Sequence, residues 1–243
     1  AKAERLEEFF KEFSGSYNYL INSHSPANHH GVAMLIRNDI QWEGPINIEL
    51  DCPPRYDTKS TDPSCGRVLA AKIIVDGINM LVVTTYVPNS GVDRKSPLKN
   101  LNYRITKWDH SLFKALQRMG TKYERVIWLG DINVAPQDID VNYPKILMRH
   151  AGFTIEERNS LNGFLQDSGW IDVWRQQHPQ KIAYSYKGYN NAKCKLRLDS
   201  CIITPNLCDS VVESVIYPDK DFMESDHNPV SIKLKVNSEK EVP

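Results

Sequence analysis

Apolar residues recur along the chain with two periods, one typical of helices and the other typical of strands. Spacings of three and four residues predict amphipathic helices over 2–13, 102–118 and 154–167. The last of these has a helix-start signal, with Thr154 as the N-cap and Glu157 at the third helical position. The expected buried stripe of the middle helix is Ile105, Trp108, Leu112, Phe113 and Leu116.

Short runs rich in β-branched and aromatic residues predict strands. These runs are 17–21, 31–36, 40–50, 68–75, 80–86, 126–129, 171–174, 184–186, 197–203, 211–217 and 230–236. Residues 76–79, Asp-Gly-Ile-Asn, are a turn signal that joins two of the runs into a hairpin. Strand pairs alternate with single helices, so the pattern predicts two β-sheets with helices outside them.

Composition narrows the class of protein. The 243 residues are 41% hydrophobic and 25% charged, which is typical of a globular chain long enough for one large core. No apolar run approaches the ~18 residues of a membrane span, and the first ten residues are charged, unlike a signal peptide. We therefore expect no membrane partner and an intracellular location, with nucleus and cytoplasm both open.

Charge and cysteine usage add two constraints. Lysine plus arginine equals aspartate plus glutamate, at 30 each, so a nucleic-acid partner would have to bind a local basic patch. The odd number of cysteines, without a Cys-x-x-Cys spacing, favours reduced thiols over a disulfide framework or a zinc site. They are Cys52, Cys65, Cys194, Cys201 and Cys208.

Candidate chemistry begins where the apolar run 126–129 ends. Gly130 breaks the run, and Asp131 and Asn133 follow two residues apart. Residues i and i+2 of an extended chain point to the same side, so a carboxylate and an amide would project together from a strand end, where α/β folds place their sites. An Asx turn that closes a hairpin is the alternative interpretation.

Further polar side chains stand beside other predicted strands: Tyr86, Asn89, Asp199, Asp226 and His227. Such a set suits hydrolysis of a phosphodiester. Carboxylates hold a hard cation such as Mg²⁺, which neutralises developing charge, and a carboxylate near the attacking water accepts its proton. A histidine held by a second carboxylate is fixed in orientation. Taken singly, Asp226 could be a cap and His227 a packed core residue.

Several segments follow one another along the chain in an order that is typical of one protein family. They are TTYVPNSG (84–91), YRITKWDHSLF (103–113), GDINVAPQDID (130–140), AGFTIEER (151–158), DVWR (172–175), RLDSCII (197–203) and SDHNPV (225–230). With them the chain resembles the endonuclease/exonuclease/phosphatase superfamily, and within it the apurinic/apyrimidinic (AP) endonucleases of the exonuclease III type. The resemblance runs from about Gly31 to the last strand.

The resemblance implies a four-layered α/β sandwich, in which two mainly antiparallel sheets pack face to face between helices. It implies that Asp131, with Asn133 beside it, orients or deprotonates the attacking water. Asp199 and His227 would act on the scissile phosphate together with the hydroxyl of Tyr86. The implied metal ligands are Asp226, Asp131 and Asn133.

The implied reaction is Mg²⁺-dependent cleavage of DNA 5′ to an abasic site, with Mn²⁺ as a possible substitute and with room for 3′-5′ exonuclease or 3′-phosphodiesterase activity. The expected partner is double-stranded DNA with abasic sites, bound by a monomer. The expected DNA contacts are Asn89, Arg94, Tyr186, Lys187, Tyr189, Lys193, Lys195, Leu196 and Leu198. A solvated loop without a partner is the alternative for the basic stretch 187–195.

Two features depart from the family pattern. The family carries an Asn on an N-terminal strand and a metal-binding Glu on the next, whereas Glu7 and Glu8 of this chain lie on a predicted helix. We expect 1–243 to be a single domain of this type that lacks those strands. Leu196 stands where AP endonucleases often have a large aromatic residue. A related phosphoesterase acting on RNA ends or on a small phosphate ester, and a non-catalytic DNA-binding relative, stay open as alternatives.

Overall fold

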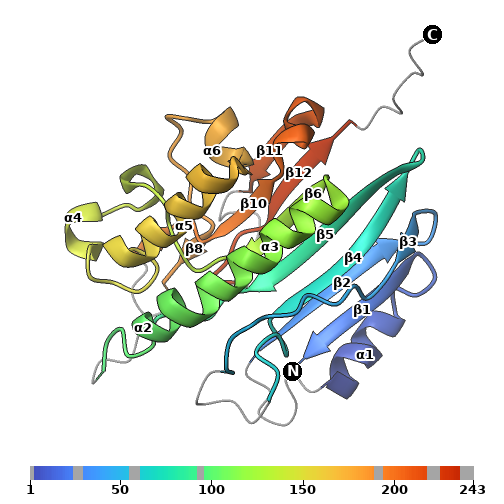
Figure 1. The fold of residues 1–243 in the computed structure, drawn as a ribbon, viewed down its shortest axis with the longest axis horizontal. Coiled ribbons are helices and arrows are strands. Elements are labelled where there is room, and N and C mark those ends of the chain that lie inside the picture. The colour runs from blue at the N-terminus through green and yellow to red at the C-terminus, as the bar shows by residue number, and fades with distance from the viewer. Residues whose placement is uncertain are drawn as a thin grey trace.

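The computed structural model describes residues 3–23, 30–54, 61–91, 96–188, 194–217 and 225–235. Within these ranges, a six-stranded sheet forms the centre of the molecule (Figure 1). In order across the sheet, its strands are β3 (Gln41–Glu43), β4 (Val68–Val75), β5 (Ile78–Tyr86), β6 (Val126–Asp131), β10 (Asp199–Ile203) and β7 (Ile171–Asp172). Neighbouring strands are antiparallel except β5 and β6, which are parallel.

A parallel pair needs a long crossover connection between its strands. A continuous helical stretch supplies it here: α2 (Leu101–Tyr103), the π-helical η1 (Arg104–Asp109) and α3 (His110–Tyr123). The crossover places α3 along one face of the sheet, and it brings the carboxyl ends of β5 and β6 to the same edge (Figure 1).

In the part of the chain that the structure describes, three two-stranded antiparallel sheets flank the central one: β1 (Tyr17–Ser23) with β2 (Gly31–Arg37), β11 (Val211–Ile216) with β12 (Val230–Leu234), and β8 (Tyr186–Lys187) with β9 (Lys195–Leu196). The β1–β2 pair packs on β4 and β5, and β12 packs on β10. The remaining helices are α1 (Ala3–Lys11), α4 (Pro144–Leu147), α5 (Ile155–Ser168), α6 (Val173–Gln177) and the 3₁₀ turns η2 (Asp138–Asp140) and η3 (Pro205–Ser210). The result is a mixed α/β fold.

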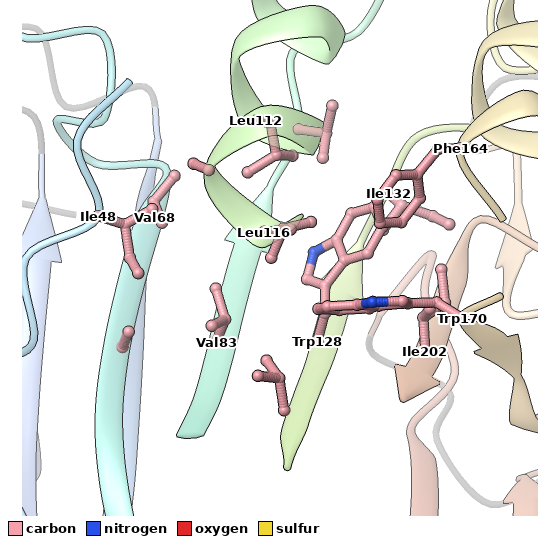
Figure 2. Packing of buried hydrophobic residues seen from close by; sticks show 14 of the residues in the cluster. Ile48, Val68, Val83, Leu112, Leu116, Trp128, Ile132, Phe164, Trp170 and Ile202 are labelled. Carbon is pink, nitrogen blue, oxygen red and sulfur yellow. The ribbon is translucent and has the colours of Figure 1, made fainter. Parts of the chain in front are cut away.

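The two faces of the central sheet bury different side chains, because successive residues of a strand point to opposite faces. On one face Trp128 packs with Phe164 of α5, at 6.0 Å between ring centroids, and Figure 2 shows Leu112 and Leu116 of α3 beside them. On the other face Ile127 joins a second cluster that includes Ile232 and Leu234 of β12. Burial on both faces accounts for the unbroken apolar run that ends at Leu129.

Three predicted strands are wrong in extent. Only Gln41–Glu43 of the run 40–50 forms a strand, and residues 44–50 have no regular structure; Pro45 has no N–H to extend the ladder. The run 171–174 is strand only over Ile171–Asp172. The Asp172 side chain then accepts a hydrogen bond from the Arg175 backbone and caps α6.

Of the run 184–186 only Tyr186 is strand, and β8 continues to Lys187. The other predicted elements are confirmed, with small shifts of their ends. The predicted helix start is also confirmed, because Thr154 and Glu157 form a capping box at the start of α5. All five cysteines are free, as expected. None of the helices in the described ranges has both the length and the apolar character needed to cross a bilayer.

Candidate active site

Three of the predicted side chains stand in one row across the central sheet. Tyr86, the last residue of β5, pairs with Asp131 at the end of β6, and Asp131 pairs with Asp199 at the start of β10. Residues paired in this way have Cα atoms about 5 Å apart and side chains on the same face. The strand order therefore brings together a phenol and two carboxylates that are far apart in the sequence.

Gly130 permits the close approach of β5 and β6 beside this row. Its φ is +127°, and a Cβ atom added there would lie 2.2 Å from the carbonyl oxygen of Thr85. No side chain fits at that distance, so glycine is required at this position. The break in the apolar run thus has a packing reason next to the site.

Asn133 holds the carboxylate of Asp131 in place. Its backbone N–H donates to Oδ1 of Asp131 and its side-chain amide donates to Oδ2, both at 2.9 Å. The same amide donates to the carbonyl of Val87 at 2.8 Å, and its oxygen accepts a hydrogen bond from Asn89 at 2.9 Å. Asn133 is 4% exposed and has a φ of +50°, a conformation that Asn tolerates. The Asx turn and the projecting carboxylate, considered as alternatives from the sequence, therefore coexist.

His227 and Asp199 form a hydrogen-bonded pair, with 2.7 Å between Nδ1 and Oδ2. Burial alone would lower the pKa of His227, but the hydrogen bond and charge of Asp199, with the charges of Asp131 and Asp226, raise that pKa to about 9. The ring is therefore an imidazolium at neutral pH. With Nδ1–H donated to Asp199, the second N–H remains to meet a ligand.

The environment also raises the pKa of Asp131, to about 7. Burial is the largest cause and the charge of Asp199 adds to it, while His227, the hydrogen bond from Asn133 and the charge of Arg104 act in the opposite direction. A carboxyl group with a pKa near neutrality can both accept and release a proton at physiological pH.

A pocket of about 540 Å³ lies beside these side chains; Asp199 contacts it only through its partner His227 and is not among the lining residues. It is lined by nine of the predicted site residues: Tyr86, Asn89, Asp131, Asn133, Tyr186, Leu196, Leu198, Asp226 and His227. Five further lining residues have no role assigned from the sequence: Gly91, Lys99, Asn100, His150 and Ala151. A hollow of about 600 Å³ elsewhere, lined by Asp76 and Arg125 among others, contains none of the predicted side chains.

The expected DNA-contact residues differ in their placement. Leu196 and Leu198 are 1% and 5% exposed and belong to a buried apolar cluster. They line the pocket but present little accessible area to a ligand. Lys187 and Lys195 face each other across the β8–β9 pair, outside the pocket lining. The other three, Arg94, Tyr189 and Lys193, lie outside the described residues.

A buried ion network supports the start of β10, and no sequence motif indicates its extent. Arg197 is fully buried; it donates from Nε to Asp140 at 2.7 Å and from a terminal nitrogen to Asp172 at 2.7 Å. Arg175 pairs with the same Asp140. Burial alone would raise the pKa of Asp140, but its bonds to Arg197 and Arg175 lower it.

The expected metal ligands supply part of a metal site. Asp131 and Asp226 both line the pocket, and oxygen donors of this kind suit a hard divalent cation. However, no group of three or more His, Cys, Asp or Glu side chains in the described ranges is arranged to hold a metal ion. The amide of Asn133 is already committed to protein partners. These residues therefore do not complete a metal site by themselves.

Comparison with known proteins gives the family. The model of the Endonuclease/Exonuclease/phosphatase family matches residues 2–227. The chain belongs to this family. It is similar to the DNA repair nuclease APEX1 of Danio rerio, at 32% identity over 90% of this chain and 65% of that protein. It is also similar to a DNA-(apurinic or apyrimidinic site) endonuclease of Dictyostelium discoideum, at 36% identity over 64% of this chain and 43% of that protein.

Solved structures agree with the fold. An AP endonuclease from Leishmania major superposes with a TM-score of 0.76 at 26% identity, covering 91% of this chain and 71% of that one. An AP endonuclease from Archaeoglobus fulgidus gives a TM-score of 0.71 at 25% identity, covering 92% and 81%. The predicted family is thus confirmed, and the chain spans less than two thirds of the length of the curated relatives it matches.

Proposed function

We propose that the chain is a Mg²⁺-dependent DNA repair phosphodiesterase that cleaves the DNA backbone 5′ to an abasic site. The observation that carries the proposal is the row of Tyr86, Asp131 and Asp199. Tyr86 and Asp131 line one pocket together with His227, which is hydrogen-bonded to Asp199. Relatives named as AP endonucleases support the choice of substrate.

Asp131 is the candidate general base. Its carboxylate oxygens are held by Asn133, and its pKa of about 7 leaves a large share of it ionised at neutral pH. The ionised form would accept a proton from the attacking water, because a base with a pKa near the working pH combines the correct protonation state with useful driving force.

His227 is the candidate stabiliser of the phosphate. Asp199 fixes the orientation of the ring through Nδ1 and keeps it positively charged. The remaining N–H would donate to a phosphate oxygen, and the hydroxyl of Tyr86 would add an uncharged donor. Such preorganised donors act on the charge that develops during displacement at phosphorus.

A divalent cation would neutralise charge on the phosphate when bound, and Asp226 and Asp131 are its candidate donors. Proteins of this family are generally dependent on a divalent metal. The described His, Cys, Asp and Glu side chains do not form a group of three that could hold the cation, so its other ligands would be further oxygen donors, such as waters and phosphate oxygens, or residues outside the described ranges.

Two lysines support a polyanionic substrate. Lys187 and Lys195 are paired directly across β8 and β9, and like charges in that position repel each other. A DNA phosphate beside either ammonium group would be attracted to it, and each such contact would make binding more sensitive to salt.

The proposal includes the complete four-layered sandwich of the family. The β1–β2 pair contacts the central sheet at β4 and β5, and the β11–β12 pair contacts it at β10. These two pairs would be parts of one second sheet, with α3 and α5 on the outer face of the first sheet and α1 outside β1.

A cleavage assay tests the function directly. The substrate is a duplex with one abasic-site analogue, incubated with Mg²⁺ or with EDTA. We expect a single nick 5′ to the lesion in Mg²⁺ only, and an undamaged duplex of the same sequence should stay intact. Cleavage of RNA ends or of a small phosphate ester, with abasic DNA left intact, would overturn the DNA assignment.

A further inference from the structure

Two buried charged residues lie in the helical crossover, away from the pocket surface. Nε of Arg104 is 2.5 Å from Oδ1 of Asp109, and the two side chains are 3% and 2% exposed. They bound the π-helical stretch η1. In an α-helix, side chains five residues apart point about 140° away from each other, whereas the wider π turn brings such residues towards the same side.

The remaining guanidinium donors of Arg104 bond to backbone carbonyls, not to side chains. One terminal nitrogen donates to the carbonyl of Pro88 at 3.0 Å and to that of Asn133 at 3.4 Å. The other donates to the carbonyl of Ile132 at 2.8 Å. Pro88 belongs to the loop after β5, and Ile132 and Asn133 belong to the loop after β6. One side chain therefore joins the loop that carries Asn89 to the loop that carries Asn133, and both residues line the pocket.

Asp109 is fixed in turn from the opposite direction. Its second oxygen accepts a hydrogen bond from the hydroxyl of Ser160 on α5 at 2.9 Å. The backbone N–H of Arg104 donates to Asn100, whose own N–H donates to the carbonyl of Ser90 in the loop after β5. Asp109 thus binds the guanidinium group on one side and the loop carbonyls bind it on the other. Its fixed position leaves the two loops little freedom to move.

We infer that Arg104, oriented by Asp109, is a positioning residue for the reaction: it fixes the loop after β5 against the loop after β6, so that Asn89 reaches Asn133 and Asn133 holds Asp131. The role rests on the proposed function, since the reaction is the one assigned to the same pocket. Arg104 itself does not line the pocket.

The fork shape of arginine explains why this residue type is needed. Three carbonyls and one carboxylate are met by donors in a rigid plane, an arrangement that a lysine ammonium does not reproduce. An apolar side chain would leave Pro88, Ile132 and Asn133 with weaker or missing partners in a buried place. A misplacement of about 1 Å at a reacting group can reduce a rate about 10²-fold.

The test separates positioning from simple stability. In Arg104→Met/Asp109→Asn the buried charges are removed together, so no unpaired ion remains, and the new amide still accepts from Ser160. Arg104→Lys keeps the charge and loses the fork. Leu116 is fully buried further along the same helical stretch. Leu116→Ala is therefore a destabilising control that leaves the contacts of Arg104 with Asp109 and with the two loops intact.

We expect kcat on abasic duplex to fall about 10- to 100-fold in both Arg104 variants, with KM within about twofold of wild type. Leu116→Ala should lower the urea midpoint with kcat unchanged at temperatures where it is folded. A double variant with wild-type kcat, or a Leu116→Ala protein with an equal loss of kcat, would overturn the inference.

Hydrogen exchange gives a second measurement that needs no activity. The backbone N–H of Asn133, which donates to Asp131, should exchange faster in the double variant than in Leu116→Ala at matched stability. Equal exchange would show that Arg104 does not restrain the loop. If the wild-type protein fails to cleave abasic DNA, the proposed function is wrong. The exchange result still shows whether Arg104 restrains the loop after β6.

Discussion

Charged side chains surround the pocket in two different settings. In the row at the pocket, Asp131 and Asp199 are adjacent, and the burial and mutual repulsion of these carboxylates raise the pKa of Asp131 to about 7. Just before β10 in the chain, Arg197 lies between Asp140 and Asp172. Against the effect of burial, the hydrogen bond and charge of Arg197, with those of Arg175, lower the pKa of Asp140. In the first setting the negative charge of Asp131 is poorly compensated, which makes its carboxyl group reactive. In the second setting the arginine and aspartate charges compensate one another and stabilise the fold.

The largest expected effect is on activity, from Asp131→Asn at the row. Loss of the base should reduce cleavage of abasic duplex about 10³-fold. The same change should stabilise the fold at pH 8 by on the order of 1–2 kcal/mol. The sign follows from the raised pKa: the folded carboxyl group keeps a proton between about pH 4 and 7 that the unfolded chain has released, so ionisation on going to higher pH destabilises the folded state.

Kinetics and urea unfolding at pH 5 and pH 8 would check both parts, and the gain in stability should be smaller at pH 5. Asp138→Asn is the matched control, because that carboxylate is exposed and pairs with Arg158 at the surface. Retained cleavage by Asp131→Asn would remove Asp131 from the role of base. A loss of stability at pH 8 would contradict the contrast between the two settings.

The next effect is on stability, from Arg197→Met in the buried network. Removal of one partner leaves Asp140 and Asp172 without their main counter-charge in a buried place, which costs about 3–5 kcal/mol. Urea unfolding at pH 7 measures it. Lys72→Met breaks the partly exposed pair with Glu43 and should cost less than about 1 kcal/mol. Equal losses in the two variants would mean that burial does not distinguish these pairs.

The two settings also differ in how far the sequence predicts them. Polar residues beside strand ends were visible as short motifs, and they gave Tyr86, Asp131 and Asp199 without a structure. Their alignment in one row depends on the register of three strands that are distant in the sequence. No local pattern specifies that register, although each strand was predicted.

The buried ion pairs were much less accessible to sequence reasoning. Arg197 and Arg104 look like ordinary surface arginines within their segments, since arginine is seldom fully buried. Their partners Asp140 and Asp109 lie at the ends of the short helical segments η2 and η1, where a carboxylate usually faces solvent. The π-helical turn that aligns Arg104 with Asp109 likewise has no sequence signature in the 3.6-residue period that predicted the helix.

The smallest predicted effect concerns the pair of Asp199 and His227, which belongs to the row yet compensates its own charges. Asp199→Asn should move the pKa of His227 from about 9 towards its ordinary value of 6.5, because the hydrogen bond and charge that raise it are lost or weakened. A group with a raised folded pKa stabilises the fold fully below its unfolded pKa and loses that contribution as the pH rises through the folded one. Wild type should therefore exceed the variant in stability by about 1–2 kcal/mol near pH 6, with the difference fading by pH 10.

NMR titration of the imidazole signals, with urea unfolding at pH 6 and pH 10, measures both quantities in one pair of proteins. The ring of His178, which lies 3.1 Å from the carbonyl oxygen of Ser214, is an internal control, because the substitution does not change that contact. An unchanged pKa of His227 in Asp199→Asn would show that Asp199 does not hold the imidazolium. In that case Asp199 and His227 would not compensate each other's charges as the residues of the buried network do. Another group would have to keep the His227 ring positively charged.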